Sequence, residues 1–96
     1  MTTPQQIESK IKSIKPYLKQ EFGISHIGYF GSFARGDHHE KSDVDVIVKL
    51  SKKLGWKFFD LKYYLESVLE RKVDLVTEPS LKKQWKDQIL KDVRYI

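Results

Sequence analysis

Two short segments of the chain carry residues suited to phosphate and metal chemistry. Gly31 and Ser32 form a turn in which glycine lets the backbone approach a ligand closely and free N–H groups favour an anion. Asp43 and Asp45 are separated by one residue, so on a strand both carboxylates would point to the same face. Neighbouring carboxylates repel each other unless a cation lies between them. Two carboxylates and a triphosphate are ligands that Mg²⁺ prefers, which points to phosphoryl or nucleotidyl transfer.

Each segment also has an ordinary structural explanation. A Gly-Ser turn commonly joins a strand to a helix, and surface strands often carry polar residues on one face. A third acid, Asp74, lies in the apolar run Val73–Val76 and needs a partner or access to water. If it converges on Asp43 and Asp45, three carboxylates could hold two metals, one at an attacking hydroxyl and one at the triphosphate. The alternative for Asp74 is a strand-edge residue that faces water.

Hydrophobic periodicity and turn residues predict the elements that position these acids. Thr3, Pro4 and Gln6 predict a capped helix start, and Gly23 predicts the end of that helix near Phe22. The following elements are expected to be a strand Ile24–Phe30, a turn opening a short helix at Ser32–Gly36, a loop Asp37–Lys41, a strand Asp43–Leu50, a helix from Gly55, a strand Val73–Val76 and a last helix after Pro79 and Ser80.

This order predicts an α/β (α+β) fold in one domain over residues 1–96. We expect a small mixed sheet of at least three strands with helices packed on one face. Pro16 lies inside the first helix pattern and predicts a kink or a break there. On the second strand, Val44, Val46 and Val48 would face the core, and the residues that alternate with them would face the open side: Asp43, Asp45 and Ile47.

Composition narrows the function classes. The 96 residues are 40% hydrophobic and 32% charged, which is typical of a globular protein, and no apolar run is long enough to span a bilayer. The chain has no cysteine and opens with no apolar leader, so we expect a cytoplasmic protein with no membrane partner. The net charge of +5 is spread over the first and last helices, which favours solvated helix faces over direct nucleic-acid binding.

Histidine and tryptophan residues offer weaker functional signals. His38 and His39 are adjacent, so their rings point apart, and no third ligand lies at zinc spacing. We therefore expect a solvated loop there rather than a metal site. Trp56 and Trp85 are expected to be core or interface anchors.

The combined pattern of the motifs resembles the signature of the polymerase-beta-like nucleotidyltransferase superfamily, and most closely its minimal nucleotidyltransferase (MNT) branch. The matching segments are Gly31-Ser32, Ala34-Arg35-Gly36, Ser42-Asp43-Val44-Asp45 and Asp74. The resemblance implies that Asp43 and Asp45 are paired metal ligands. It also implies that Asp74 is the third metal ligand and helps to deprotonate the acceptor hydroxyl.

The same resemblance implies roles for three residues around the turn. Gly31 and Ser32 would contact the triphosphate, and Arg35 is similar to a position near the nucleotide phosphates. A structural ion pair of Arg35 with Asp37 or Glu40 is the alternative.

The resemblance further implies an activity, cofactors and a partner. The expected reaction is Mg²⁺-dependent transfer of AMP from ATP to a hydroxyl, with a two-metal site. Because so short a chain has little room for an acceptor platform, another molecule must present that hydroxyl. In the MNT family the partner is typically a HEPN-domain ribonuclease toxin, so the chain would be the antitoxin, acting on a tyrosine. Two alternatives stay open: a non-catalytic module that neutralises the partner by occlusion, and a nucleic-acid-modifying transferase, suggested only by the positive charge.

Overall fold

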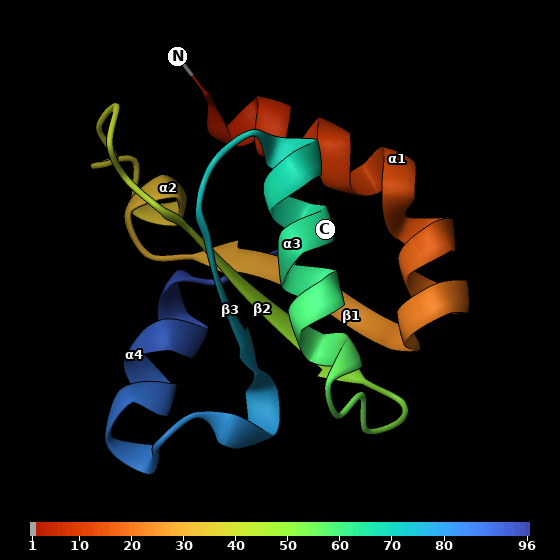
Figure 1. The fold of residues 1–96 in the computed structure, drawn as a ribbon. Coiled ribbons are helices and arrows are strands. Elements are labelled where there is room, and N and C mark those ends of the chain that lie inside the picture. Colours follow the sequence, from red (N-terminus) through yellow and green to blue (C-terminus); the bar gives the residue numbers. More distant parts are fainter. Residues whose placement is uncertain (1) are drawn as a thin grey trace.

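A four-stranded mixed sheet, in the order β3-β2-β1-β4, organises the computed structural model, which describes residues 2–96. Strand β2 pairs antiparallel with β1 and parallel with β3, while β4 pairs antiparallel with β1. Figure 1 shows the elements in space. In chain order they are α1 (Pro4–Phe22), β1 (Ile24–Phe30), α2 (Ser32–Arg35), β2 (Val44–Leu50), α3 (Lys57–Leu69), β3 (Val73–Thr77), the 3₁₀ helix η1 (Glu78–Ser80), α4 (Lys83–Asp92) and β4 (Arg94–Tyr95).

Helix α1 has both of its predicted ends. The Thr3 hydroxyl accepts a hydrogen bond from the Gln6 N–H at 3.1 Å, and the Gln6 side chain accepts one from the Thr3 N–H at 3.0 Å, which confirms the capping box. Gly23 ends the helix in a left-handed conformation. Of the kink or break predicted at Pro16, the break is wrong, because α1 continues through this residue, and the kink stays a prediction. Pro16 and Lys12 are both exposed, so the Lys12 carbonyl that loses its helical partner can reach water.

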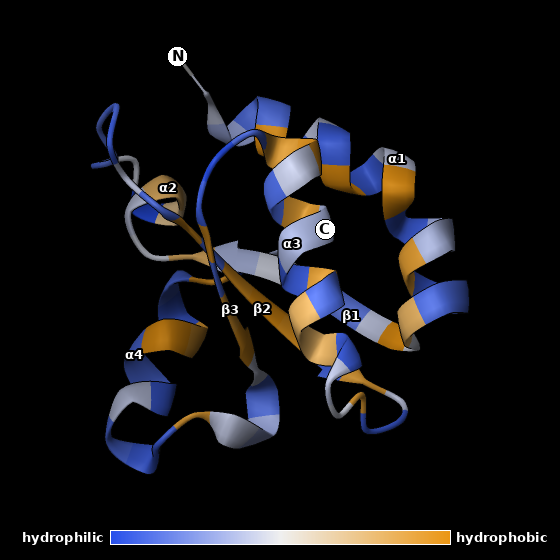
Figure 2. Ribbon diagram, in the orientation of Figure 1, coloured by the Kyte–Doolittle hydropathy of each residue, from blue (hydrophilic) through white to orange (hydrophobic). Residues whose placement is uncertain are grey.

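Helices α1 and α3 cover one face of the sheet and form the core with it. The three valines of β2 are at most 1% exposed and lie in this core, as predicted: Val44, Val46 and Val48. Helix α3 contributes Leu61, Leu65 and Leu69, each at most 1% exposed. Figure 2 shows the apolar residues of β2 and β3 at the centre of the molecule and the mixed, amphipathic colouring of α1 and α3. The mixed α/β class and the three predicted strands are therefore confirmed.

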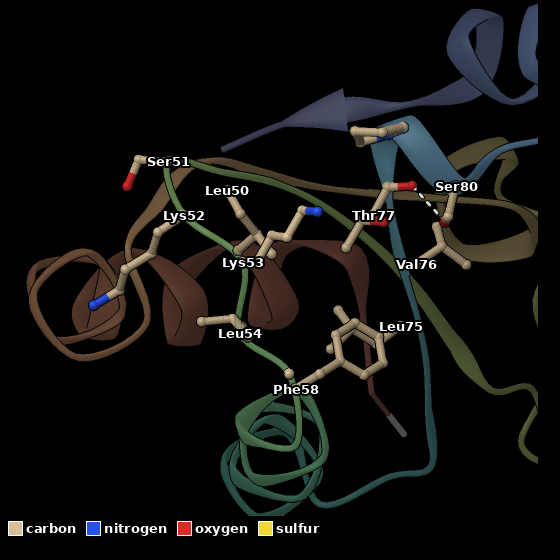
Figure 3. Close-up of a pocket in the computed structure, with 12 residues that line it drawn as sticks. Leu50, Ser51, Lys52, Lys53, Leu54, Phe58, Leu75, Val76, Thr77 and Ser80 are labelled. Atoms are coloured by element: carbon tan, nitrogen blue, oxygen red, sulfur yellow. Dashed lines mark hydrogen bonds between the residues drawn. The ribbon is translucent and has the colours of Figure 1, made fainter.

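The opposite face of the sheet is only partly covered. Helix α4 lies on the side of the strands away from α1 and α3 (Figures 1 and 3). There η1 contacts β2 and α4 contacts β1, and Ile47 is 1% exposed although it lies outside the main core. Because side chains alternate along a strand, Asp45 points to this same side. The acid is thus on the sheet face that the core helices leave open.

Several aromatic side chains lie on the surface. Trp56 is 86% exposed and Trp85 is 59% exposed, so the prediction that they anchor the core is wrong, and the interface role stays a prediction. Trp56 immediately precedes α3, and α4 has no buried residue, so neither tryptophan has a core to enter. Among residues 2–96, no helix combines the length and apolarity needed to cross a membrane.

Candidate active site

Asp45 and Asp74 lie side by side on neighbouring strands. They are direct partners in the parallel pairing of β2 with β3, so both side chains point to the same face of the sheet. Asp74 is exposed and Asp45 is half-buried. This register brings the predicted third acid to the predicted pair, which the sequence pattern could only suggest.

Asp43 differs slightly from its predicted position. It lies immediately before β2 rather than in it, and its side chain is exposed. The next residue, Val44, is joined to β3 by a hydrogen bond from its N–H to the Lys72 carbonyl at 3.0 Å. Asp43 is therefore held at the entrance of the strand, within electrostatic range of Asp45.

Gly31 forms the turn between β1 and α2 and lies directly against Asp45. Its φ of 72° and ψ of −146° belong to a region that only glycine adopts readily. A Cβ atom at this position would overlap the Oδ2 atom of Asp45. The preceding residue, Phe30, is the strand partner of Asp45. Glycine is thus required here by the backbone conformation and by the closeness of the carboxylate.

The turn leaves backbone donors beside the acids. The first hydrogen bond of α2 runs from the Arg35 N–H to the Gly31 carbonyl at 3.0 Å. The N–H groups of Ser32, Phe33 and Ala34 precede it and have no partner within the helix. The structure therefore brings the predicted phosphate turn and the predicted metal ligands together.

The electrostatics of the site centre on Asp45. The pKa of its carboxyl is raised from 3.8 to about 6, chiefly by burial and then by the charges of Asp74 and Asp43. The positive charge of Arg35 opposes this shift. A carboxylate that is partly desolvated and faces two others is stabilised by a cation. The residues described, 2–96, nevertheless contain no ready-made group of three or more His, Cys, Asp or Glu side chains with the spacing of metal ligands.

Arg35 forms a structural ion pair with Asp37, which was one of the two roles that the sequence offered for it. Its guanidinium donates to Asp37 at 3.1 Å and to Asp92 of α4 at 3.2 Å. These hydrogen bonds raise the pKa of Arg35. The contact with Asp92, which links α2 to α4, could not be foreseen from the spacing of the motif. Arg35 still acts on the site, since its charge lowers the pKa of Asp45.

Replacing Arg35 with alanine is expected to raise the pKa of Asp45 further above 6, because a cation that favours the ionised form of Asp45 is removed. The titration of the Asp45 carboxyl carbon, followed by NMR in the metal-free protein, measures this shift. Lys41→Ala removes an equal charge from the exposed loop and is the matched control. A pKa for Asp45 that stays the same in Arg35→Ala would contradict the assigned interaction.

Arg71 lies near the site and was not among the residues that the sequence predicted. It follows α3 and donates hydrogen bonds to backbone carbonyls of the loop that leads to Asp43. No motif marks it, since a lone Arg-Lys pair before a strand is commonplace.

The loop histidines are only partly as expected. His38 stacks on Phe33 with ring centroids 4.3 Å apart and planes 12° apart, so the prediction of a solvated side chain is wrong for this residue. The aromatic ring of Phe33, 1% exposed, supplies an apolar surface for it. His39 is exposed and accepts a hydrogen bond from the Lys41 N–H at 3.3 Å.

A largely apolar cavity lies away from the acids, near the other end of β2 and β3. It has a volume of about 710 Å³, and Figure 3 shows Leu50, Leu54, Phe58 and Leu75 around it, with Lys53 beside them. None of the predicted site residues lines it. The acids instead occupy the opposite, open end of the strands.

Comparisons with known proteins agree with this geometry. The family model of the nucleotidyltransferase domain matches residues 11–96. The chain is similar to the protein adenylyltransferase MntA of Thermococcus cleftensis, with 40% identity over 97 residues that cover 100% of this chain and 98% of that protein. The chain therefore belongs to the nucleotidyltransferase domain family.

Solved structures show the same fold. A structure described as a minimal nucleotidyltransferase superposes with a TM-score of 0.81 at 26% identity, covering 97% of this chain and 95% of that chain. An MNT antitoxin in complex with a tri-AMPylated HEPN toxin from Shewanella oneidensis superposes with a TM-score of 0.66 at 24% identity, covering 94% of this chain and 70% of that chain. The resemblance to minimal nucleotidyltransferases is confirmed.

Proposed function

We propose that this chain transfers AMP from ATP to a hydroxyl group of a partner protein and releases pyrophosphate. The observation that carries the proposal is the pairing of Asp45 with Asp74 on β2 and β3, beside the turn at Gly31. The 40% identity to a protein adenylyltransferase supports the same reaction. In this reaction the hydroxyl oxygen bonds to the α-phosphorus, and the bond from that phosphorus to the pyrophosphate oxygen breaks.

The donor set suits Mg²⁺. The raised pKa of Asp45 reflects burial and two neighbouring carboxylates, an arrangement that a hard divalent cation relieves. Asp43, Asp45 and Asp74 are the residues that would hold one or two Mg²⁺ ions. When bound, these ions would neutralise the charge of the triphosphate and make the acceptor hydroxyl a better nucleophile.

The remaining steps belong to residues of the chain. Backbone N–H groups after Gly31, together with the hydroxyl of Ser32, would bind the triphosphate oxygens. Asp74, exposed at the sheet edge, would accept the proton of the acceptor hydroxyl. Arg35 would lie near the phosphates, held there by its ion pairs with Asp37 and Asp92.

The partner we propose is a HEPN-domain toxin whose tyrosine hydroxyl is modified, which makes this single-domain chain an antitoxin of the cytoplasm. The solved complex of a similar MNT antitoxin with a tri-AMPylated HEPN toxin supports this pairing. Asp43 and Asp74 are also exposed at one end of the sheet, so a side chain that another protein presents can reach them.

The direct test combines purified chain, a HEPN-domain protein, Mg²⁺ and ATP labelled on the α-phosphate. We expect label on a tyrosine of the HEPN protein, and none when EDTA replaces Mg²⁺ or when Asp74 is changed to asparagine. In cells, the Asp43→Ala, Asp45→Ala double variant should fail to relieve toxicity. Full relief by that variant, with no label transferred by the wild type, would instead establish neutralisation by occlusion.

A further inference from the structure

We propose that Arg71 is a positioning residue that holds the loop carrying Asp43 against the phosphate-binding turn. The chemical consequence rests on the proposed function, whereas the structural role stands on contacts within the chain. Arg71 follows α3, 28 positions after Asp43 in the sequence, and its side chain returns to that loop. Within residues 2–96, the hydrogen bonds of its guanidinium go to loop carbonyls and not to the predicted metal or phosphate ligands, so Arg71 acts on the placement of those ligands.

The guanidinium binds the loop through several backbone carbonyls. Its Nε and Nη2 atoms both donate to the Ser42 carbonyl, at 3.1 and 2.8 Å. The Nη2 atom also donates to the Glu40 carbonyl and lies 3.5 Å from the His39 carbonyl. These carbonyls belong to an irregular segment that pairs with no strand, in which the His39 carbonyl also accepts the Ser42 N–H at 3.0 Å. One side chain therefore fixes the path of the chain up to the residue before Asp43.

The same guanidinium also contacts the helix that follows the phosphate turn. Its Cζ atom lies 5.4 Å from the centroid of the Phe33 ring, a cation–π contact. Phe33 is 1% exposed and directly follows Ser32, so its ring is packed into the core beside the turn. His38 stacks on that ring at 4.3 Å. Arg71 thus contacts both halves of the site, the loop before Asp43 and the helix after Gly31.

A lysine in place of Arg71 could not make this set of contacts. A guanidinium offers five N–H donors in a planar fork and can stack on an aromatic ring, whereas an ammonium is a single, strongly hydrated point charge. Asp43 is exposed and lies one residue outside β2, so its position depends on the loop rather than on the sheet. Loss of the fork should therefore loosen Asp43 while leaving Asp45 and Asp74 on their strands.

The experiment measures hydrogen–deuterium exchange and AMP transfer in Arg71→Ala and Arg71→Lys. Faster exchange is expected in residues 38–43 for both variants, with unchanged exchange in β1. Arg71→Ala should lose about 10–100-fold in kcat, the usual cost of removing a group that orients catalytic ligands, with a smaller change in the KM for ATP. Guanidinium ion at a non-denaturing concentration should restore part of the lost kcat of Arg71→Ala.

Lys72→Ala is the matched control, because Lys72 is the exposed neighbour of Arg71 and carries the same charge. It should leave the exchange of residues 38–43 and kcat close to wild type. Unchanged exchange in residues 38–43 of Arg71→Ala, or an equal loss of kcat in Lys72→Ala, would overturn the proposal. If Arg71→Ala unfolds, Arg71→Lys decides, since it keeps the charge and lacks only the fork. If the wild type transfers no AMP, the proposed function fails, and the exchange measurement still tests the role of Arg71.

Discussion

Asp45→Asn is expected to stabilise the metal-free protein while it abolishes AMP transfer. The pKa of Asp45 is raised to about 6, so above that pH the folded state holds a charge that the unfolded state accommodates more easily. The resulting penalty is absent at low pH and complete above pH 6. Discounted for the half-exposed site, it should amount to about 1–3 kcal/mol of unfolding free energy. The asparagine variant, which carries no charge there, lacks it.

The loss of activity should be about 10³-fold or more, because a metal ligand supplies several kcal/mol of transition-state stabilisation. Urea unfolding from pH 4 to pH 8, with and without Mg²⁺, separates the two effects. Wild type should lose stability as the pH rises and regain it with Mg²⁺, whereas Asp45→Asn should do neither. If the variant were less stable than wild type above pH 6 without metal, the assigned repulsion among the three acids would be refuted.

Gly31→Ala is expected to damage both the fold and the site. The backbone conformation at Gly31 costs any other residue about 1–3 kcal/mol. The new Cβ would also overlap the Asp45 carboxylate, so this side chain must leave its position. A displacement of about 1 Å at a reacting centre can cost about 100-fold in rate. Thermal unfolding and AMP transfer measure the two losses.

Two further variants separate the cost of the backbone conformation from the cost of the overlap with Asp45. Gly55→Ala has a similar positive φ, 57°, but its Cβ would enter open space far from the acids, so it should cost stability alone. In an Asp45→Ala background the overlap is absent, and Gly31→Ala should cost less stability than it does in wild type. Additive costs in that double-variant cycle would show that the carboxylate contact does not contribute.

Much of the scaffold could be predicted because it depends on local patterns. Strand β1 has the predicted bounds, since its apolar run ends at a glycine, and α1 has a capping box that three residues specify. The face of β2 followed from simple alternation of side chains. Asp74 could be placed on a strand because apolar residues flank it. These inferences needed only neighbours in the sequence.

The features that could not be predicted depend on contacts between segments that are far apart in the sequence. Nothing in the composition of β3 says that it pairs parallel to β2, or that its register joins Asp45 to Asp74. The strand β4 has two residues, too few for a periodicity. The contacts of Arg35 with Asp92 and of Arg71 with Ser42 span 57 and 29 positions in the sequence. Trp56 was expected to be an anchor because large aromatics are usually buried, yet it lies outside the amphipathic stripe of α3.

Strand β3 lies at the edge of the sheet, which affects how stably Asp45 and Asp74 are held together. Asp45 belongs to β2, which has a strand on either side, whereas Asp74 belongs to an edge strand with one neighbour. Edge elements open locally more often than central ones, so a transient detachment of β3 would separate Asp45 from Asp74 without unfolding the rest of the molecule. Under the proposed function, Asp45 and Asp74 would hold the same nucleotide–metal complex, which would then act as a reversible cross-link between β2 and β3. Under the proposed function, substrate binding would therefore stabilise the pairing of β2 with the edge strand β3.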